Sequence, residues 1–189
     1  MISHNRKDEG TPPEKASFNW FPGHMAKALR EIKTKLKTVD IVLEIRDARV
    51  PLVSGNKALD AVLGNKSRLI LLNKVNLADP KIIAIWEVWF KEQDIPYAFV
   101  NCFDKTSLKK VISLARKVVE EKRLACNPEM LEQKSKLKLM VIGLPNTGKS
   151  TIINQLANKS ATKTADKPGQ TQMQQWITID KDLELLDTP

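Results

Sequence analysis

The chain has 189 residues, of which 42% are hydrophobic and 28% charged, a balance typical of a globular protein with one well-packed domain. The formal net charge of +9 favours anionic partners, nucleic acid first and acidic membrane surfaces second, but a solvated lysine-rich surface gives the same balance. Two cysteines outside any CxxC spacing and only two histidines argue against a zinc site or a disulfide framework, and no apolar run approaches the roughly 20 residues of a membrane span.

The first 17 residues, MISHNRKDEGTPPEKAS, are polar and contain no apolar stretch, so we expect a disordered tail rather than a secretory signal. Acidic residues at Asp8, Glu9 and Glu14 argue against a mitochondrial presequence. Together with the unclustered cysteines, this start predicts a protein of the cytoplasm.

Residues 24–40 carry apolar side chains at steps of four, three and four, which predicts one face of a helix. The stripe consists of Met25, Leu29, Ile32 and Leu36. Lys27, Arg30 and Lys37 lie elsewhere around the helix and should face solvent. Two interpretations stay open at this point: a basic helix that touches nucleic acid, and an ordinary packed helix with solvated lysines.

Further along, apolar segments alternate with helical ones. Asp79-Pro80 is a helix start, with aspartate as N-cap and proline in the first turn, and that helix should run to about Gln93. Another helix should end at about Arg123, and the polar segment 124–136 reads as a linker. Helices are also expected after residue 54 and over 148–158. Strands are predicted at 39–46, 68–73, 97–101, 137–142, 174–179 and 182–187, the last two joined as a hairpin. The alternation predicts a three-layer α/β fold with a mostly parallel, six-stranded sheet.

A phosphate-binding motif, G-x-x-x-x-G-K-[ST], begins at Gly143, after a predicted strand and before a predicted helix. Its glycines let backbone N–H groups surround phosphates, and the helix start adds a favourable field. The expected nucleotide-binding residues of this loop are Pro145, Asn146, Thr147, Gly148, Lys149, Ser150 and Thr151. Lys149 should reach the β- and γ-phosphates, and the Ser150 hydroxyl should ligate Mg²⁺. The motif alone does not choose between ATP and GTP, and the alternative is a chance match in a glycine-containing turn.

Two candidate Mg²⁺ ligands follow this motif. The loop KPGQT at 167–171 carries Thr171 where a switch threonine is expected, with Thr162 and Thr164 as weaker candidates. The apolar segment LELLDTP then places Asp187 at a strand end, where an aspartate holds Mg²⁺ through water.

Base-recognition loops precede the phosphate loop instead of following it. Asn73-Lys74-Val75-Asn76 follows an apolar strand, and the segment 101–107, NCFDKTS, follows the next strand, so that Asn101 and Cys102 would face a base. The parts of a GTPase are thus all present in rotated order. Circular permutation preserves a sheet when the original termini lie close together.

Six segments together resemble the circularly permuted GTPases of the ribosome biogenesis GTPase A (YlqF/RbgA) type. They are NWFPGHMAKALREI, EIRDARVPLVSGN, LLNKVNLADP, GLPNTGKSTIINQL, KPGQTQMQQWI and LELLDTP. Mitochondrial ribosome-associated GTPase 1 is a relative of the same kind. The resemblance implies a P-loop GTPase domain over residues 18–189 that acts in late assembly of the large ribosomal subunit and contacts its rRNA. It further implies GTP and GDP as ligands with Mg²⁺, and hydrolysis that the ribosome stimulates. A monomer is expected, although the sequence leaves the oligomeric state open.

The resemblance also implies roles for single residues. Asn73, Lys74 and position 76 would frame the guanine, and Cys102 stands near a position where the family often has serine. Asn146 matches an asparagine that coordinates K⁺ in potassium-stimulated members.

The family lacks the usual catalytic glutamine, so another group must orient water. His24 is our candidate beside Lys149, and a helix-start or packing residue is the alternative role for His24.

The sequence departs from the family at Asn76, where the family has aspartate. Asparagine offers one acceptor and one donor in place of two acceptors, which predicts relaxed guanine selectivity. The chain stops at Pro189, so we expect the family's C-terminal helical RNA-binding domain to be absent and hydrolysis to suffer more than binding. The alternative to a GTPase switch is therefore a hydrolysis-impaired module that binds nucleotide and RNA. An ATP-dependent P-loop kinase leaves the base-recognition motifs unexplained.

Overall fold

The computed structural model describes residues 22–126, 136–157 and 176–186. Twelve elements follow one another in these ranges. They are α1 Pro22–Lys35, β1 Ile41–Asp47, α2 Lys57–Leu63, β2 Ser67–Asn73, the 3-10 turn η1 Val75–Leu77, α3 Pro80–Glu92, β3 Tyr97–Phe99, α4 Lys105–Cys126, β4 Leu137–Gly143, α5 Lys149–Ala157, β5 Trp176–Asp180 and β6 Leu183–Leu186. The tail predicted over residues 1–17 lies outside the described ranges.

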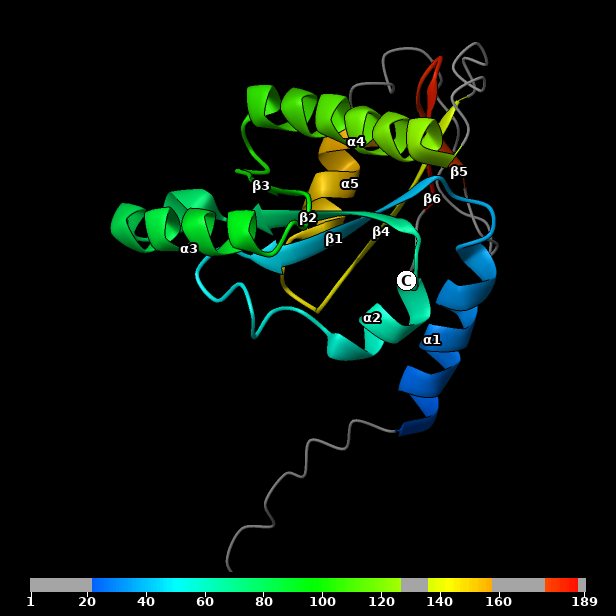
Figure 1. Cartoon of the computed structure of the whole chain (residues 1–189), viewed down its shortest axis with the longest axis horizontal. Helices are drawn as coiled ribbons and strands as arrows, with labels where there is room; N and C mark the ends of the chain where they lie inside the picture. Colours follow the sequence, from blue (N-terminus) through cyan, green and yellow to red (C-terminus); the bar gives the residue numbers. More distant parts are fainter. Residues whose placement is uncertain (1–21, 127–135, 158–175, 187–189) are drawn as a thin grey trace, which may run out of the picture.

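Six strands of the described chain form one sheet in the order β3-β2-β1-β4-β6-β5. The neighbouring strands are parallel except for β5 and β6, which form an antiparallel hairpin across residues 180–183. Figure 1 shows the sheet running through the middle of the molecule between helices. The predicted fold, a mostly parallel six-stranded α/β sheet, is confirmed.

The central strand β1 lies between two parallel neighbours and is buried along its whole length, including its charged residues Glu44, Arg46 and Asp47. Its register pairs Asp47 with Asn73 of β2 and Ile45 with Gly143 of β4. The carboxyl ends of these three strands therefore meet at one edge of the sheet. In parallel α/β sheets this edge is where ligands bind.

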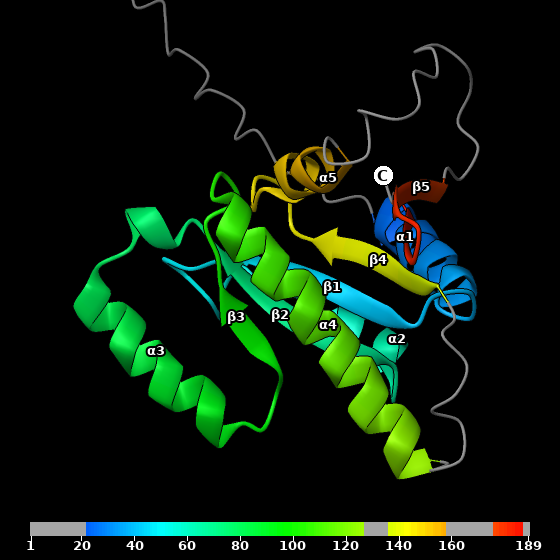
Figure 2. The ribbon, with the colours of Figure 1, turned by 90° about the horizontal axis from the view of Figure 1, so that it is seen from above.

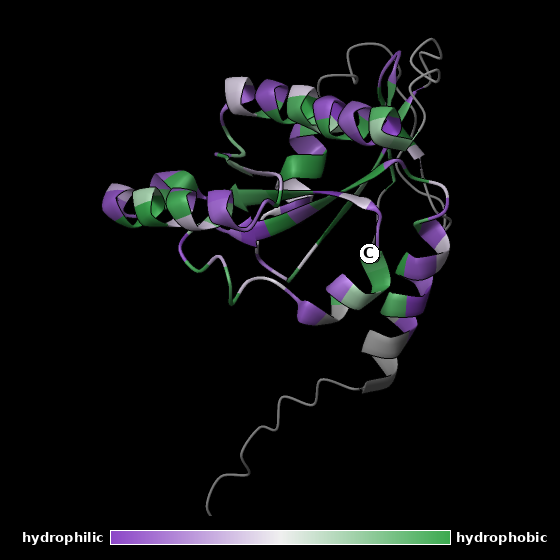
Figure 3. Cartoon of the chain, in the orientation of Figure 1, coloured by the Kyte–Doolittle hydropathy of each residue, from purple (hydrophilic) through white to green (hydrophobic). Residues whose placement is uncertain are grey.

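Helices cover both faces of the sheet. The face with Leu43 and Ile45 packs against α4 and α5. On the other face Val42 packs with α1 and α2, and Ile70 packs with α3. Figure 2 shows α4 and α5 lying over the strands from one side, and Figure 3 shows mostly apolar strands between helices that carry both polar and apolar residues. These are the three layers predicted from the sequence.

The apolar stripe of α1 turns toward the sheet as predicted. Leu36 is buried just after the helix, and Leu29 and Ile32 pack against the cluster on that face. Lys27 and Lys37 are exposed, as the helical periodicity requires. The side chain of Met25 lies outside the described part of the chain.

The predicted start of α3 is confirmed. The Asp79 carboxylate accepts a hydrogen bond from the Lys81 N–H at 2.8 Å, and Pro80 occupies the first helical position. This cap fixes the direction in which the chain leaves the 3-10 turn η1.

Three predicted boundaries are wrong by two residues or more. The first strand begins at Ile41 and not at residue 39. The third strand spans only Tyr97–Phe99, because the chain turns after Val100 and the Asp104 N–H donates to the Asn101 carbonyl. The helix α4 continues to Cys126, so the segment 124–126 is helical and not part of a linker. In the sequence, the first signal against a helical conformation is at Asn127, because the residue before a proline disfavours the helical region.

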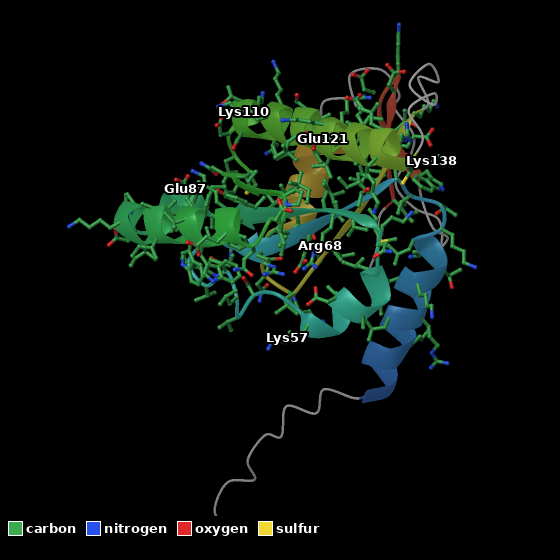
Figure 4. All side chains as sticks on the ribbon, in the orientation of Figure 1. Lys57, Arg68, Glu87, Lys110, Glu121 and Lys138 are labelled. Carbon is green, nitrogen blue, oxygen red and sulfur yellow. The ribbon has the colours of Figure 1, made fainter. Side chains whose placement is uncertain are left out.

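A group of charged side chains joins β1, β2 and α2, and its central carboxylate is buried. Glu44 is 1% exposed and accepts from Arg46 Nε at 2.7 Å. Arg68 of β2 also pairs with Glu44, and with Asp60 of α2 at 2.6 Å. Figure 4 shows Arg68 near the centre of the molecule, whereas Lys110 and Glu121 lie along the outside of α4. Arg68 and Arg46 thus compensate a carboxylate that burial alone would disfavour.

Candidate functional site

A cavity of about 390 Å³ lies at the carboxyl edge of the sheet, where β2 and β4 end and α5 begins. Its volume is that of a small-molecule site. The residues that line it are Asn73, Lys74, Asn76, Leu77, Cys102, Phe103, Asn146, Gly148, Lys149, Ser150 and Thr151. The cavity therefore unites the phosphate loop with both predicted base-recognition loops.

The phosphate loop needs its two glycines for space. A Cβ on Gly143 would lie 2.4 Å from the Ile45 carbonyl oxygen of β1, and one on Gly148 would lie 2.2 Å from Asn73 Nδ2. Both glycines also have positive φ, 153° and 100°. Between them Asn146 takes a left-handed conformation with φ 62°, which asparagine tolerates better than most residues.

Lys149 begins the helix α5 and points back over the loop. Its ammonium donates to the Leu144 carbonyl at 2.9 Å. Burial lowers the pKa of the Lys149 ammonium from its ordinary value, since the charged form loses water contacts there. A phosphate in the cavity would offset this cost by supplying negative charge. Ser150 and Thr151 follow on the first turn of α5, where backbone N–H groups have no partner within the helix.

Asn73 links three segments with its side chain. It is fully buried at the end of β2. Its Nδ2 donates to the Thr147 carbonyl at 2.9 Å, and its Oδ1 accepts from the Cys102 N–H at 3.1 Å. The amide thus fastens the phosphate loop and the second base-recognition loop to the end of β2.

Lys74 follows in a left-handed conformation, with φ 66° and ψ 30°. Its ammonium donates to the Asn146 carbonyl at 2.6 Å and to Asp47 Oδ2 at 2.9 Å. The aliphatic part of Lys74 therefore crosses from the base-recognition loop to the phosphate loop along the cavity wall.

The other end of the cavity combines Asn76 and the backbone-anchored Cys102 with two apolar side chains. Leu77 is 60% exposed and Phe103 is 71% exposed, and both line the cavity. Sequence reasoning missed these two residues. The available signal was their position, since each directly follows a predicted base-contacting residue.

The remaining predicted site residues lie as follows. Asn101 accepts a hydrogen bond from the Phe103 N–H at 3.1 Å and is not among the lining residues. Thr147 is 3% exposed, and its hydroxyl donates to the Leu144 carbonyl at 2.9 Å, while Pro145 is exposed beside the cavity.

Three predicted site residues are outside what the structure describes. His24 lies in the first turn of α1 with an undescribed side chain, and Thr171 and Asp187 fall in undescribed ranges. Their proposed roles stay predictions. Among the described residues no group of three His, Cys, Asp or Glu side chains could hold a metal, and no helix there is long and apolar enough to cross a membrane.

Known proteins are similar in sequence to the chain that builds this cavity. A family model described as 50S ribosome-binding GTPase matches residues 138–189. The chain is 43% identical over 173 residues to ribosome biogenesis GTPase A of Priestia megaterium, an alignment that covers 92% of this chain and 60% of that protein. It is 38% identical over 149 residues to mitochondrial ribosome-associated GTPase 1 of Xenopus tropicalis, covering 76% of this chain and 45% of that protein.

Among solved structures, that of GNP-bound YlqF from T. maritima superimposes with a TM-score of 0.62 at 31% identity, over 86% of this chain and 57% of the other. The chain spans about 60% of the length of the ribosome biogenesis GTPase A proteins that it matches. Its strand order and the order of its motifs agree with the permuted arrangement. Sequence identity, sheet topology and motif order together make this chain a homologue of ribosome biogenesis GTPase A across its circularly permuted P-loop GTPase domain.

Proposed function

We propose that this chain is the GTP-binding and GTP-hydrolysing domain of a protein that acts in late assembly of the large ribosomal subunit. One observation carries the proposal. The Asn73-Lys74 loop and the phosphate loop, 74 positions apart at Asn73 and Thr147, are hydrogen-bonded around a single cavity of nucleotide size. The names of the relatives supply the ribosomal context.

In this proposal the phosphate end of the cavity is built from α5. Backbone N–H groups of its first turn bind phosphate oxygens, and the Lys149 ammonium exchanges the Leu144 carbonyl for the β- and γ-phosphates. The Ser150 hydroxyl, an oxygen donor on the cavity wall, fits a Mg²⁺ ligand, and Thr171 and Asp187 are the other proposed ligands. When bound, Mg²⁺ would neutralise negative charge on the phosphates.

Two further roles complete the proposed hydrolysis. Asn146, on the rim of the cavity, is the proposed K⁺ ligand. His24 is the proposed residue that orients the water, whose oxygen attacks the γ-phosphorus while the bond to the β-phosphate oxygen breaks.

The base end of the cavity fits a flat ring. Leu77 and Phe103 offer apolar surface, and Asn76 offers the polar edge. An aspartate at position 76 would accept from both guanine N1–H and the exocyclic amine. Asn76 can accept from N1–H, but its NH₂ then faces the guanine amine, donor against donor.

We therefore propose that this site discriminates weakly in favour of guanine. The loss of one charge-assisted hydrogen bond amounts to about 1.5–3 kcal/mol, or roughly ten- to more than a hundredfold in affinity. A base with a carbonyl at position 2, as in xanthine, accepts from the Asn76 amide and avoids the clash.

RNA is the second proposed ligand, supported by the net charge of +9 and by exposed basic side chains. Lys27, Lys33 and Lys37 of α1 and the turn after it face solvent. The proposal includes rRNA of the large subunit as partner, a monomeric state and a cytoplasmic location. Binding should weaken with salt, with log affinity falling by about 0.7–0.9 per log unit of salt for each phosphate neutralised.

A second candidate function is a module that binds nucleotide and RNA with little turnover and relaxed base selectivity. The departure at Asn76 favours it. A single-turnover hydrolysis assay with K⁺ or Na⁺, with and without large ribosomal subunits, separates the two: hydrolysis stimulated by subunits supports the GTPase switch, and binding without turnover supports the module.

The test of the site itself is a panel of dissociation constants for GTP, GDP, XTP and ATP, compared between the natural chain and Asn76→Asp. We expect Asn76→Asp to strengthen GTP binding by about tenfold or more and to weaken XTP binding. Tight binding of GTP alone by the natural chain would overturn the selectivity proposal. The absence of binding to every nucleotide in the panel would overturn the proposed function.

A further inference from the structure

The carboxylate of Asp47 lies at the end of β1 and is only 8% exposed. It accepts four hydrogen bonds. Arg49 Nε donates to Oδ1 at 2.9 Å, Arg49 Nη2 to Oδ2 at 2.7 Å, and the Arg49 N–H to Oδ1 at 3.0 Å. Lys74 Nζ donates to Oδ2 at 2.9 Å. The Arg49 guanidinium first, and Lys74 after it, hold the pKa of this carboxyl well below its usual range. Asp47 is therefore a fixed negative charge next to the cavity wall.

The backbone that carries this carboxylate is itself held. The Asp47 N–H donates to Ser54 Oγ at 2.9 Å, and the Ser54 hydroxyl donates to the Val50 carbonyl at 2.7 Å. The Val50 N–H donates to the Asp47 carbonyl at 3.0 Å, and the Ala48 N–H donates to the Asn73 carbonyl at 2.7 Å. The turn 48–55 is thus tied to β2 at the residue that precedes Lys74.

The ammonium of Lys74 is held between this carboxylate and the phosphate loop. It lies 2.9 Å from Asp47 Oδ2 and 2.6 Å from the Asn146 carbonyl oxygen. A free lysine side chain samples many rotamers, and ordering it costs conformational entropy. Asp47 removes most of this freedom before any ligand arrives. The side chain that lines the cavity is therefore already in place.

We propose that Asp47 is a positioning residue of the nucleotide site, which holds Lys74 against the phosphate loop and thereby couples the turn 48–55 to nucleotide binding. The inference rests on the proposed nucleotide binding. A purely structural carboxylate would need only Arg49 and its own turn. The contact with Lys74 gives Asp47 a route to the ligand, because Lys74 lines the cavity and Asp47 does not.

The test compares Asp47→Asn with Asp40→Asn, which makes the same chemical change at the other end of β1. Asp40 accepts from Arg123 at 2.9 Å and from the Lys138 N–H at 2.8 Å, so it is also paired with an arginine and a backbone N–H. Dissociation constants for GDP, GTP and XTP are measured for both variants. We expect Asp47→Asn to weaken binding about tenfold, the value of one charge-assisted hydrogen bond, and Asp40→Asn to change it by less than about twofold.

A double-mutant cycle with Lys74→Met decides whether Asp47 acts through Lys74. In the Lys74→Met background, Asp47→Asn should weaken nucleotide binding by less than about twofold. Equal losses in both backgrounds would contradict a positioning role and leave Asp47 as a structural residue. Normal binding by Asp47→Asn would overturn the inference while the proposed function stands. Failure of the natural chain to bind any of the three nucleotides would overturn both.

Hydrogen exchange gives a second readout that needs no Asp47 variant. Because coupling between two sites is reciprocal, GDP should slow exchange of the amides in the turn 48–55 of the natural chain. In Lys74→Met saturated with GDP this protection should disappear. Unchanged exchange in the natural chain upon nucleotide binding would refute the coupling.

Discussion

The substitution Asn73→Ala tests the most connected side chain of the site. Asn73 is fully buried and holds the Thr147 carbonyl at 2.9 Å and the Cys102 N–H at 3.1 Å. Alanine removes both partners and leaves a donor and an acceptor of the backbone without a hydrogen bond. Each unsatisfied buried group costs about 1–3 kcal/mol, so the free energy of unfolding should fall by about 2–6 kcal/mol. That is a large part of the roughly 5–15 kcal/mol by which domains are stable.

Urea unfolding followed by circular dichroism measures this loss. With a slope of about 2 kcal/mol per molar urea, a loss of 4 kcal/mol lowers the midpoint by about 2 M. Asn101→Ala is the matched control, because Asn101 makes a local hydrogen bond to the Phe103 N–H at the same edge of the sheet. The control should lose about 0.5–1.5 kcal/mol, the usual net value of one hydrogen bond. If Asn73→Ala lost no more than the control, the linking role of Asn73 would be refuted.

Three further predictions concern the same sheet. Glu44→Gln takes the buried carboxylate away from two guanidinium groups and should lower stability by about 3–5 kcal/mol in the same urea assay; a loss under about 1 kcal/mol would contradict the buried pairing. Gly148→Ala puts a Cβ against a buried amide and should cost about 3 kcal/mol, whereas Gly64→Ala, with nothing within 4 Å, should cost only the about 1–2 kcal/mol of a left-handed residue. The lowered pKa of Asp47 stabilises the fold at pH values above the unfolded-state pKa, about 3.9, so stability should fall as the pH drops below about 4. In a plot of the urea midpoint against pH, Asp47→Asn should make this fall less steep. An unchanged slope in the variant would show that Asp47 does not cause the fall.

Much of the fold could be predicted because its signals are local. Apolar runs predicted the strands, and the pair Asp79-Pro80 predicted the start of α3. The boundary errors arose where a local signal is weak. Val100 still donates to the Leu72 carbonyl of β2, but the turn in which the Asp104 N–H donates to the Asn101 carbonyl ends the strand there. The extension of α4 to Cys126 passes through residues whose polarity resembles that of a linker.

The sequence predicted which residues line the site better than it predicted the contacts that those residues make. The motifs identified Lys149 and Asn76, and both line the cavity. They assigned Asn73 to the base, whereas the structure uses both polar atoms of its side chain within the protein. Leu77 and Phe103 were missed because their only signal was a position directly after a predicted base-contacting residue, and their residue types alone do not indicate a ligand contact.

The sequence by itself determined the fold class, the permuted order of motifs and the chemistry available to the site, because each depends on residue types at short spacing. Only the tertiary structure decided which groups meet. The hydrogen bonds from Lys74 to Asp47 and Asn146 span 27 and 72 positions of the chain. Such contacts depend on strand order and register, and these are set by how the whole sheet packs rather than by any one segment.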